Sequence, residues 1–208
     1  MRTSLFLVRH AETEWNKSNR YQGHLDIELS QKGKEQAKQL ALHLAHARFD
    51  AIYASDLARA SDTARAIAEV QRMNVLYSPE LREINVGAWA GLTREEIVAR
   101  DPEAFKRWLS DSTDVPFPEG ESYAMVQARV MPFIYKIIQM HQGSRILVVS
   151  HSGPLKVIIL SLLGLSLDLR KIIYLGNASI SMISITDGNP RLELLNANGC
   201  KELIASER

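Results

Sequence analysis

The chain has 208 residues, of which 46% are hydrophobic, and this is enough for one sizeable core with an inserted subdomain. Its 25 Lys and Arg residues are balanced by 24 Asp and Glu residues, which argues against a nucleic-acid partner held on a broad basic surface. Cys200 is the only cysteine, so the chain forms neither an intramolecular disulfide nor a thiolate metal site.

Short apolar runs alternate with helical patterns in the first part of the chain. The run at 4–8 predicts a buried strand, and it is too short for a secretion signal peptide. The expected strands are 4–8, 49–55 and 74–78, and the expected helices are 29–47 and 56–71. Ser30 is the expected cap of the first helix, and Ser55 or Asp56 that of the second.

The pattern changes between 80 and 122, where glycines and prolines separate short helical pieces. We expect residues 84–120 to leave the sheet as a small helical excursion that serves as a lid or as a substrate-recognition segment. The candidates there to meet a substrate carboxylate are four basic residues, Arg94, Arg100, Lys106 and Arg107.

The alternation returns in the last third of the chain. The expected elements are a helix at 123–142 capped by Ser122, a strand at 144–150, a helix at 153–164, and a hairpin of 179–185 and 191–197 around the turn 187–190. The longest apolar run, 155–167, is shorter than the ~20 residues that a membrane span requires. We therefore expect a cytosolic protein with no membrane partner.

Strands that alternate with helices predict an α/β fold. We expect a three-layer α/β/α sandwich whose central sheet is mainly parallel, with the terminal hairpin adding an antiparallel edge. Because the chain contains no repeat and no low-complexity linker, residues 1–208 are expected to form a single domain.

Two apolar strands end in the same way, "FLVRH" at 6–10 and "LVVSH" at 147–151. Ligands of open α/β sheets bind beyond the carboxyl ends of the strands. If the two strands are neighbours, His10 and His151 converge there, together with Arg9 and with Arg59 from the helix that follows 49–55. Arginine offers paired donors suited to phosphate oxygens, so the sequence predicts a small phosphate site.

The segment "LVRHAETEWN" resembles the arginine-histidine motif of the histidine phosphatases, the phosphoglycerate mutase-like superfamily. Further segments resemble that family in the expected order: "YQG" (21–23), "LSQKGKEQAKQLA" (29–41), "ASDLARASDTA" (54–64), "LREINVGAWAGLT" (81–93), "FPEGES" (117–122) and "VVSHSG" (148–153). The resemblance covers nearly the whole chain. It implies the phosphoglycerate mutase-like fold and the phosphatase branch of the family.

The resemblance also implies a role for each matching residue. His10 would be the nucleophile that accepts the phosphoryl group, and Glu83 would donate a proton to the leaving oxygen. The groups implied to bind the phosphate and its transition state are Arg9, Asn16, Arg59 and His151. Gln22 and Gly23 are further substrate-binding candidates, and Gly23 is also expected to be a turn residue. Ala11 and Ser152 stand where many relatives have glycine.

These residues predict a phosphatase that hydrolyses small organic phosphate monoesters through a phosphohistidine. No metal and no cofactor are expected, because arginine and histidine supply the charge that Mg²⁺ supplies in other phosphoryl-transfer sites. The candidate substrates are phosphoserine, α-ribazole 5′-phosphate and phosphoglycerates. Relatives are often dimers, so a homodimer is one assembly that the resemblance allows.

Two alternatives stay open at the level of sequence. A cofactor-dependent phosphoglycerate mutase uses the same pocket but returns the phosphoryl group, although such relatives are generally longer. A non-catalytic phosphate-binding or interaction module is the second, since a fold alone does not guarantee activity. His24 is interpreted as a surface or helix-face residue and not as a ligand, and Trp108 as a packing residue of the excursion.

Overall fold

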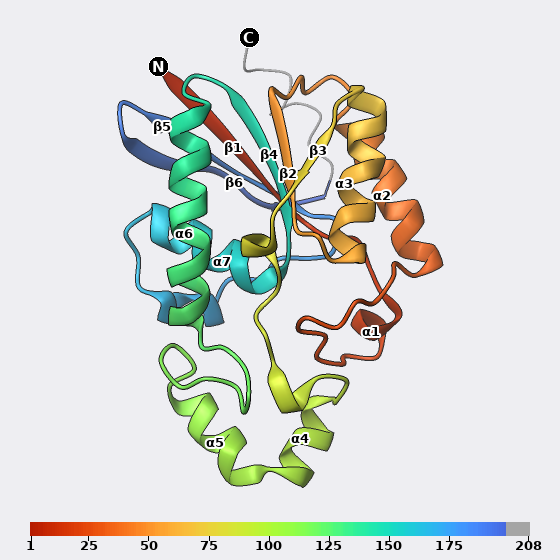
Figure 1. Ribbon diagram of the computed structural model, residues 1–208, viewed down its shortest axis with the longest axis vertical. Helices are drawn as coiled ribbons and strands as arrows, with labels where there is room; N and C mark the ends of the chain where they lie inside the picture. The colour runs from red at the N-terminus through yellow and green to blue at the C-terminus, as the bar shows by residue number, and fades with distance from the viewer. Residues whose placement is uncertain (199–208) are drawn as a thin grey trace.

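The computed structural model describes residues 1–198, so Cys200 lies outside the described part of the chain. A six-stranded sheet runs through its centre in the order β3-β2-β4-β1-β5-β6 (Figure 1). The strands are β1 (Arg2–Arg9), β2 (Ala51–Ala54), β3 (Val75–Tyr77), β4 (Arg145–Ser150), β5 (Ile180–Thr186) and β6 (Asn189–Ala197). The first four pair in parallel, and β5 and β6 add an antiparallel edge next to β1, which confirms the predicted sheet.

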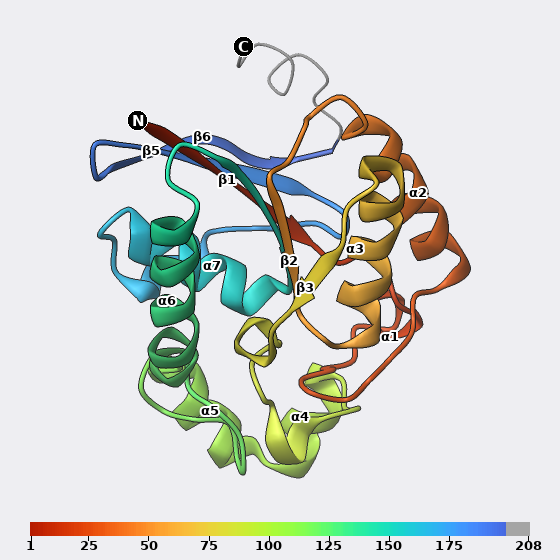
Figure 2. The same cartoon turned by 45° about the horizontal axis from the view of Figure 1, so that its top comes forward.

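Helices cover both faces of this sheet (Figure 2). Helices α2 (Gln31–His43) and α3 (Ala58–Gln71) lie on one face, and α6 (Tyr123–Met140) and α7 (Ser152–Leu162) lie on the other. Ser30 and Ser122 cap α2 and α6 as predicted, because each side chain accepts a hydrogen bond from a backbone N–H in the first turn. The three-layer architecture predicted from the alternation is therefore confirmed.

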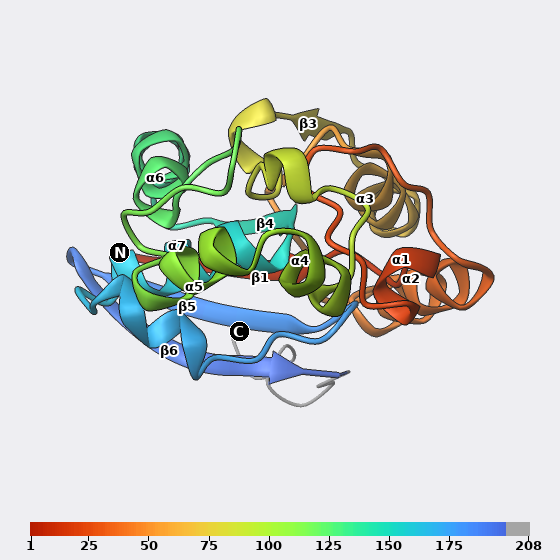
Figure 3. The same cartoon turned by 90° about the horizontal axis from the view of Figure 1, so that it is seen from below.

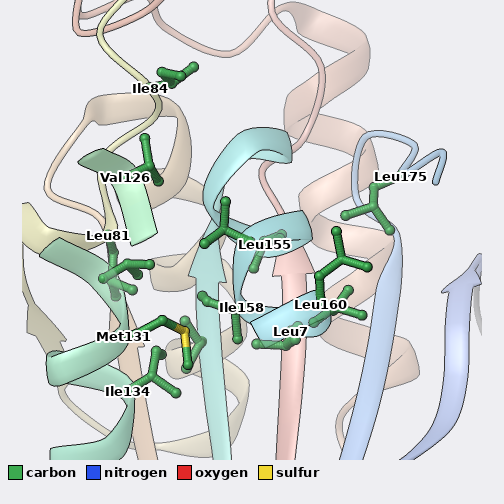
Figure 4. Packing of buried hydrophobic residues seen from close by; sticks show 14 of the residues in the cluster. Leu7, Leu81, Ile84, Val126, Met131, Ile134, Leu155, Ile158, Leu160 and Leu175 are labelled. Atoms are coloured by element: carbon green, nitrogen blue, oxygen red, sulfur yellow. The ribbon is translucent and has the colours of Figure 1, made fainter. Parts of the chain in front are cut away.

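Strand β1 shows how the two cores are divided. Leu5 and Leu7 belong to the cluster under α6 and α7, whereas Phe6 and Val8 belong to the cluster under α2 and α3. All four are 0–1% exposed, as a period of two requires in a strand that is covered on both faces. Figure 4 shows Leu7 beneath Leu155 and Ile158 of α7. Full burial of each such side chain contributes about 1.5–3 kcal/mol.

The excursion expected at 84–120 extends beyond the carboxyl ends of the parallel strands, and in Figure 3 its helices lie in front of the sheet. Its helical elements are the 3-10 turn η2 (Gly87–Trp89) and the helices α4 (Arg94–Arg100) and α5 (Pro102–Ser110), and the 3-10 turn η1 (Pro79–Leu81) precedes them. Trp89 is fully buried and packs edge-to-face against Trp108 and Phe117. This aromatic cluster gives the excursion a small core of its own.

The cap predicted for α3 was wrong. Leu57 occupies the N-cap position without a side-chain hydrogen bond, while Asp56 is paired with Arg82. Instead, the carboxylate of Asp26 accepts a hydrogen bond of 2.6 Å from the backbone N–H of Ala58. A residue 32 positions away in the sequence thus caps the helix, which no local pattern could indicate.

Two short helical elements were also absent from the sequence prediction. These are α1 (Glu14–Lys17), which begins after the capping residue Thr13, and the 3-10 turn η3 (Leu167–Lys171). Helices this short carry too little periodic signal to be detected. Within residues 1–198, no helix combines the length and the apolarity needed to cross a bilayer.

Candidate active site

The two strands that end in histidine are neighbours. Arg9 pairs with Ser150 in the register of β1 and β4, and the N–H of His10 donates to the carbonyl of Ser150 at 2.9 Å. The histidines that follow both strands therefore lie at one edge of the sheet, with the ring centroids of His10 and His151 5.1 Å apart. The structure brings these residues together as expected from the strand ends.

Both arginines are anchored by backbone carbonyls. Arg59, in the first turn of α3, is fully buried and donates from Nη1 to Leu25 and from Nη2 to Gly23, at 2.9 and 2.8 Å. Arg9 donates from Nη1 to the carbonyl of Leu175 at 2.6 Å. Burial lowers the pKa of Arg59 to about 10, although the nearby Glu83 opposes that shift, so the guanidinium keeps its charge at neutral pH.

His10 is held as a neutral imidazole with a defined tautomer. Burial, and then the charges of Arg59 and Arg9, move its pKa well below the usual range. Its Nδ1 lies 2.7 Å from the carbonyl oxygen of Ala11, which can only accept, so Nδ1 carries the proton. Nε2 therefore keeps its lone pair. Ala11 adopts an ordinary negative φ, so alanine is accommodated at this turn without strain.

His151 is completely buried beside His10 and is not among the residues that line the cavity. Burial and the charge of Arg59 lower its pKa well below the usual range as well. Its Nε2 lies 2.9 Å from the hydroxyl of Ser55, at the carboxyl end of β2. Ser55 was not selected from the sequence, since a serine after a strand has no distinguishing signal.

Several buried nitrogen atoms of this cluster have no hydrogen-bond partner within the protein. They are Nε of Arg9, Nε of Arg59 and Nδ1 of His151. A buried polar atom left unpaired costs about 1–3 kcal/mol, so native proteins seldom retain a group of them without a ligand. Three such atoms beside a neutral imidazole mark a site for an anion that offers several oxygens.

Glu83 lies between η1 and η2 with its carboxylate held by backbone donors. Its Oε1 accepts from the N–H of Ile84 at 2.9 Å and from the N–H of Gly153 at 3.1 Å. A Cβ atom on Gly153 would come within 2.5 Å of that oxygen, so glycine is required for this close approach. The second oxygen, Oε2, is left for a ligand. This contact with Glu83 is the reason for a glycine two residues after His151.

Asn16, Gln22 and Gly23 also line the cavity, as the sequence analysis anticipated. The amide oxygen of Asn16 accepts hydrogen bonds from Thr13 and from Asn177, which leaves its NH₂ group as the free donor. Gly23 has a positive φ of 54°, and a Cβ there would lie 2.7 Å from Cγ2 of Val86. Its contribution is therefore the turn that presents a carbonyl to Arg59.

The cavity that these residues enclose has a volume of about 310 Å³. Its outer part is lined by Arg20 and by aromatic residues of the excursion and its surroundings: Tyr21, Trp108, Phe117 and Tyr123. None of the four basic residues selected from the excursion lines the cavity. Arg100, for example, pairs with Asp101, and Arg94 stacks on Phe105, because α4 and α5 direct these side chains away. Trp108 does line it, so its role is wider than packing.

Residues that support the site form a second group that sequence reasoning missed. Thr63 donates to the carbonyl of Arg59 at 2.7 Å and accepts from the N–H of Ala11 at 3.0 Å, which joins α3 to the loop after β1. Its place one helical turn after Arg59 is the only signal that could have indicated it. Among residues 1–198, no group of three or more His, Cys, Asp or Glu side chains has the arrangement of a metal site.

The fold and the site together define a mainly parallel α/β protein whose site suits a tetrahedral anion beside a neutral imidazole. A sequence model of the histidine phosphatase superfamily (branch 1) matches residues 5–198. The chain is 42% identical over 185 residues to phosphoserine phosphatase 1 of Hydrogenobacter thermophilus, a match that covers 88% of this chain and 87% of that protein. It is 36% identical over 188 residues to the metal-independent phosphoserine phosphatase of Arabidopsis thaliana, covering 89% and 77%.

Solved structures agree with this assignment. A putative α-ribazole-5′-P phosphatase from Escherichia coli superposes with a TM-score of 0.89 at 30% identity, covering 95% of this chain and 97% of that one. The chain belongs to the histidine phosphatase superfamily. The predicted fold and the predicted reaction class, the hydrolysis of phosphoric monoesters by a phosphatase, are confirmed.

Proposed function

We propose that this phosphatase works without a metal ion, through a phosphohistidine formed on His10, and that its substrate is a small organic phosphate. The observation that carries the proposal is the neutral His10 ring, with Nε2 unprotonated, near the unpaired Nε donors of Arg9 and Arg59 and the unpaired Nδ1 of His151. A nucleophile and fixed positive charges are the two components that phosphoryl transfer requires.

In the first step, Nε2 of His10 forms a bond to phosphorus while the bond from phosphorus to the ester oxygen breaks. Glu83, in its protonated form, gives its proton to that oxygen, so an alcohol leaves. Arg9, Arg59 and His151 bind the equatorial oxygens, where the transition state spreads its charge, and the NH₂ groups of Asn16 and Gln22 assist.

In the second step, a water molecule attacks phosphorus and the nitrogen–phosphorus bond breaks. The carboxylate of Glu83 takes the proton of that water, and inorganic phosphate is released with His10 restored. Each group returns to its starting protonation state, so the cycle needs no other reactant.

The substrate candidates are phosphoserine, α-ribazole 5′-phosphate and phosphoglycerates, with phosphoserine first. Two relatives with substantial identity carry the name phosphoserine phosphatase, while a solved relative is named for α-ribazole-5′-P. A cavity of about 310 Å³ suits a phosphorylated amino acid or hydroxy acid. Arg20 also lines the cavity, but its guanidinium is paired with Glu96 at 2.8 and 3.2 Å and with the carbonyl of Gly91 at 2.6 Å, so a substrate carboxylate there would have to compete with Glu96.

We further propose that residues 1–208 form one histidine phosphatase domain in which 84–120 is the substrate-recognition segment. Trp108 and Phe117 of that segment line the outer cavity, which supports this role. A cytosolic location and a homodimer stay predictions, to be checked by fractionation and by light scattering.

Trapping of the covalent intermediate tests the mechanism. A brief reaction with a ³²P-labelled monoester, followed by an alkaline quench, is expected to leave an acid-labile label on the wild type and none on His10→Ala. An unlabelled wild type that still hydrolyses the ester would exclude the phosphohistidine. Transfer of the label to added phosphoglycerate, rather than to water, would favour the mutase alternative.

Removal of metal ions tests whether the phosphatase works without a metal ion. Activity in excess EDTA is expected to equal activity without it, since arginine and histidine supply the stabilising charge. Activity that disappears in EDTA and returns with Mg²⁺ would contradict this. A panel of phosphometabolites compared by kcat/KM then ranks phosphoserine against the other candidates.

A further inference from the structure

The backbone around Glu83 is held much more firmly than an exposed loop would be. Arg129 of α6 donates from Nη1 to the carbonyl of Glu80 at 2.6 Å, and from Nη2 to the carbonyls of Arg82 and Glu83, both at 2.9 Å. One guanidinium thus binds three carbonyls within four residues of the segment that carries the proposed acid.

Glu121 completes this arrangement from the other side. Its carboxylate binds Arg129 at 2.8 Å through Oε1 and at 3.1 Å through Oε2, and Oε2 also accepts from the N–H of Asn85 at 2.9 Å. Although burial opposes it, the hydrogen bonds from Arg129 and Asn85 keep the pKa of Glu121 below its usual value. The charged pair therefore anchors the chain both before and after Glu83.

His24 makes a separate contact with the same peptide. Its Nε2 lies 2.8 Å from the carbonyl oxygen of Glu83, and because that oxygen can only accept, Nε2 donates. The side chain of His24 is one-third exposed, so it lies at the surface as expected, but its ring also binds the backbone of a distant segment. Gly23 and Leu25, on either side of His24, are the two residues whose carbonyls bind Arg59.

We propose that His24 and Arg129 are positioning residues for Glu83, and that the 22–25 turn connects the phosphate-binding Arg59 to the proposed proton donor. The carbonyl of Glu83 accepts from His24 and from Arg129, while its side chain accepts from the backbone of Ile84 and Gly153. With the peptide and the carboxylate both held, Oε2 stays beside the leaving oxygen. This inference rests on the proposed role of Glu83 as the acid.

A misplaced acid has a kinetic signature of its own. An alkoxide is a poor leaving group and needs a proton in the transition state, whereas nitrophenolate leaves without one. Loss of the position of Glu83 should therefore lower kcat/KM, which covers the steps up to the phosphohistidine, for alkyl esters and spare it for activated aryl esters. Hydrolysis of the phosphohistidine also uses Glu83 but is common to all esters, so its slowing does not discriminate between them. General damage to the fold, or to phosphate binding, slows both kinds of ester in proportion.

The experiment compares kcat/KM on phosphoserine and β-glycerol phosphate with kcat/KM on p-nitrophenyl phosphate. Glu83→Gln is the reference and is expected to lose about 10²-fold or more in kcat/KM on the alkyl esters. His24→Leu is expected to lose about tenfold in kcat/KM on the same esters, with kcat/KM on the aryl ester within about twofold of wild type. His24→Gln keeps a donor near the place of Nε2 and is expected to recover most of the loss.

Matched variants complete the design. His43→Leu, at the half-buried last residue of α2, is expected to behave as wild type on all three esters. Arg129→Lys and Glu121→Gln are expected to show the same selectivity as His24→Leu. If either fails to fold, the two His24 variants carry the test, because this side chain is partly exposed.

The outcomes separate this inference from the proposed function. Selective loss in Glu83→Gln and in His24→Leu, with recovery in His24→Gln, supports both. Selective loss in Glu83→Gln alone, with His24→Leu equal to wild type or slowed on all esters alike, overturns the positioning role. No selectivity in Glu83→Gln itself overturns the acid role of Glu83 and the positioning role together.

Discussion

The inner and outer ends of the cavity differ in the kind of side chain that they present and in the elements that carry those side chains. At the inner end, His10 and Arg59 line the cavity and His151 lies buried beside His10. All three are at most 2% exposed and come from the secondary structure of the sheet layers or directly follow it. At the outer end, Trp108 and Phe117 belong to the excursion and touch each other, with ring centroids 4.7 Å apart. The inner end holds charge in fixed positions, whereas the outer end presents an uncharged aromatic wall.

This difference assigns catalysis to the inner end of the cavity and the choice of substrate to the outer end. Groups that stabilise a transition state must be held in place before the reaction, and burial among rigid elements achieves this. Groups that select a substrate can lie on a segment that varies independently of the sheet. Changes at the inner end should therefore alter kcat, and changes at the outer end should alter KM and the order of substrates.

The largest expected effect is at Arg59. Arg59→Ala is expected to lower kcat by about 10²–10³-fold on every ester, since one preorganised donor to the transition state is removed. Steady-state kinetics on an alkyl and an aryl ester measure this. Arg65→Ala, an exposed position on the same helix, is the control and should match wild type. Equal losses in the two variants would contradict a special role for Arg59.

Gly153→Ala tests how strictly the position of the Glu83 carboxylate is required. The added methyl group meets Oε1 of Glu83, so the carboxylate has to move. We expect a loss of about tenfold in kcat/KM on alkyl esters and less on p-nitrophenyl phosphate. Alanine is favoured over glycine within a helix, by up to about 1 kcal/mol, so the melting temperature should not fall. A variant with wild-type kinetics would mean that Glu83 tolerates displacement.

The buried histidines make the stability of the inner end depend on pH. Burial and then Arg59 lower the pKa of both His10 and His151, whereas a histidine in the unfolded chain titrates near ~6.5. Below that pH the unfolded chain binds protons that the native protein does not, so the free energy of unfolding falls as the pH falls. Each histidine adds a slope approaching about 1.4 kcal/mol per pH unit.

Urea unfolding at pH 7, 6 and 5 measures this slope above the range in which carboxylates titrate. His151→Asn is expected to have a smaller slope than wild type between pH 6 and 5. A wild-type free energy that stays constant over this range would contradict the burial of two neutral imidazoles.

The smallest effect is expected at the outer end. Trp108→Phe keeps the aromatic cluster with Phe117 but changes the shape of the cavity wall. We expect KM values to change by only a few-fold, to different extents for phosphoserine and for α-ribazole 5′-phosphate, with the label on His10 still formed. A uniform loss of kcat on all substrates would place Trp108 with the inner end instead.

Much of the inner end was predictable because its signals are local. The continuous apolar runs of β1 and β4 indicated buried strands, and a histidine follows each run, so the edge of the sheet brings the two rings together. Ser30 and Ser122 likewise mark the starts of their helices, because each side chain accepts a hydrogen bond from the backbone N–H three residues later. Such features need only a few consecutive residues.

Other features depend on contacts between distant segments. His24 meets the carbonyl of Glu83 across 59 positions, and Asp26 caps α3 across 32. Arg20, rather than any of the four basic residues chosen from the excursion, lines the outer cavity, because the directions of α4 and α5 decide which side chains point inward. Contacts of this kind depend on how the loops and helices pack, and no periodic pattern in the sequence predicts them.

The amino-acid sequence alone thus determined the layered sheet, the strand-end histidines and the kind of ligand that they could hold, because these follow from local patterns of burial and charge. Only the tertiary structure decided which imidazole nitrogen keeps its lone pair, which donors stay unpaired and how Glu83 is held. Those properties arise from groups that approach one another after folding, where a few tenths of an ångström separate a hydrogen bond from a clash.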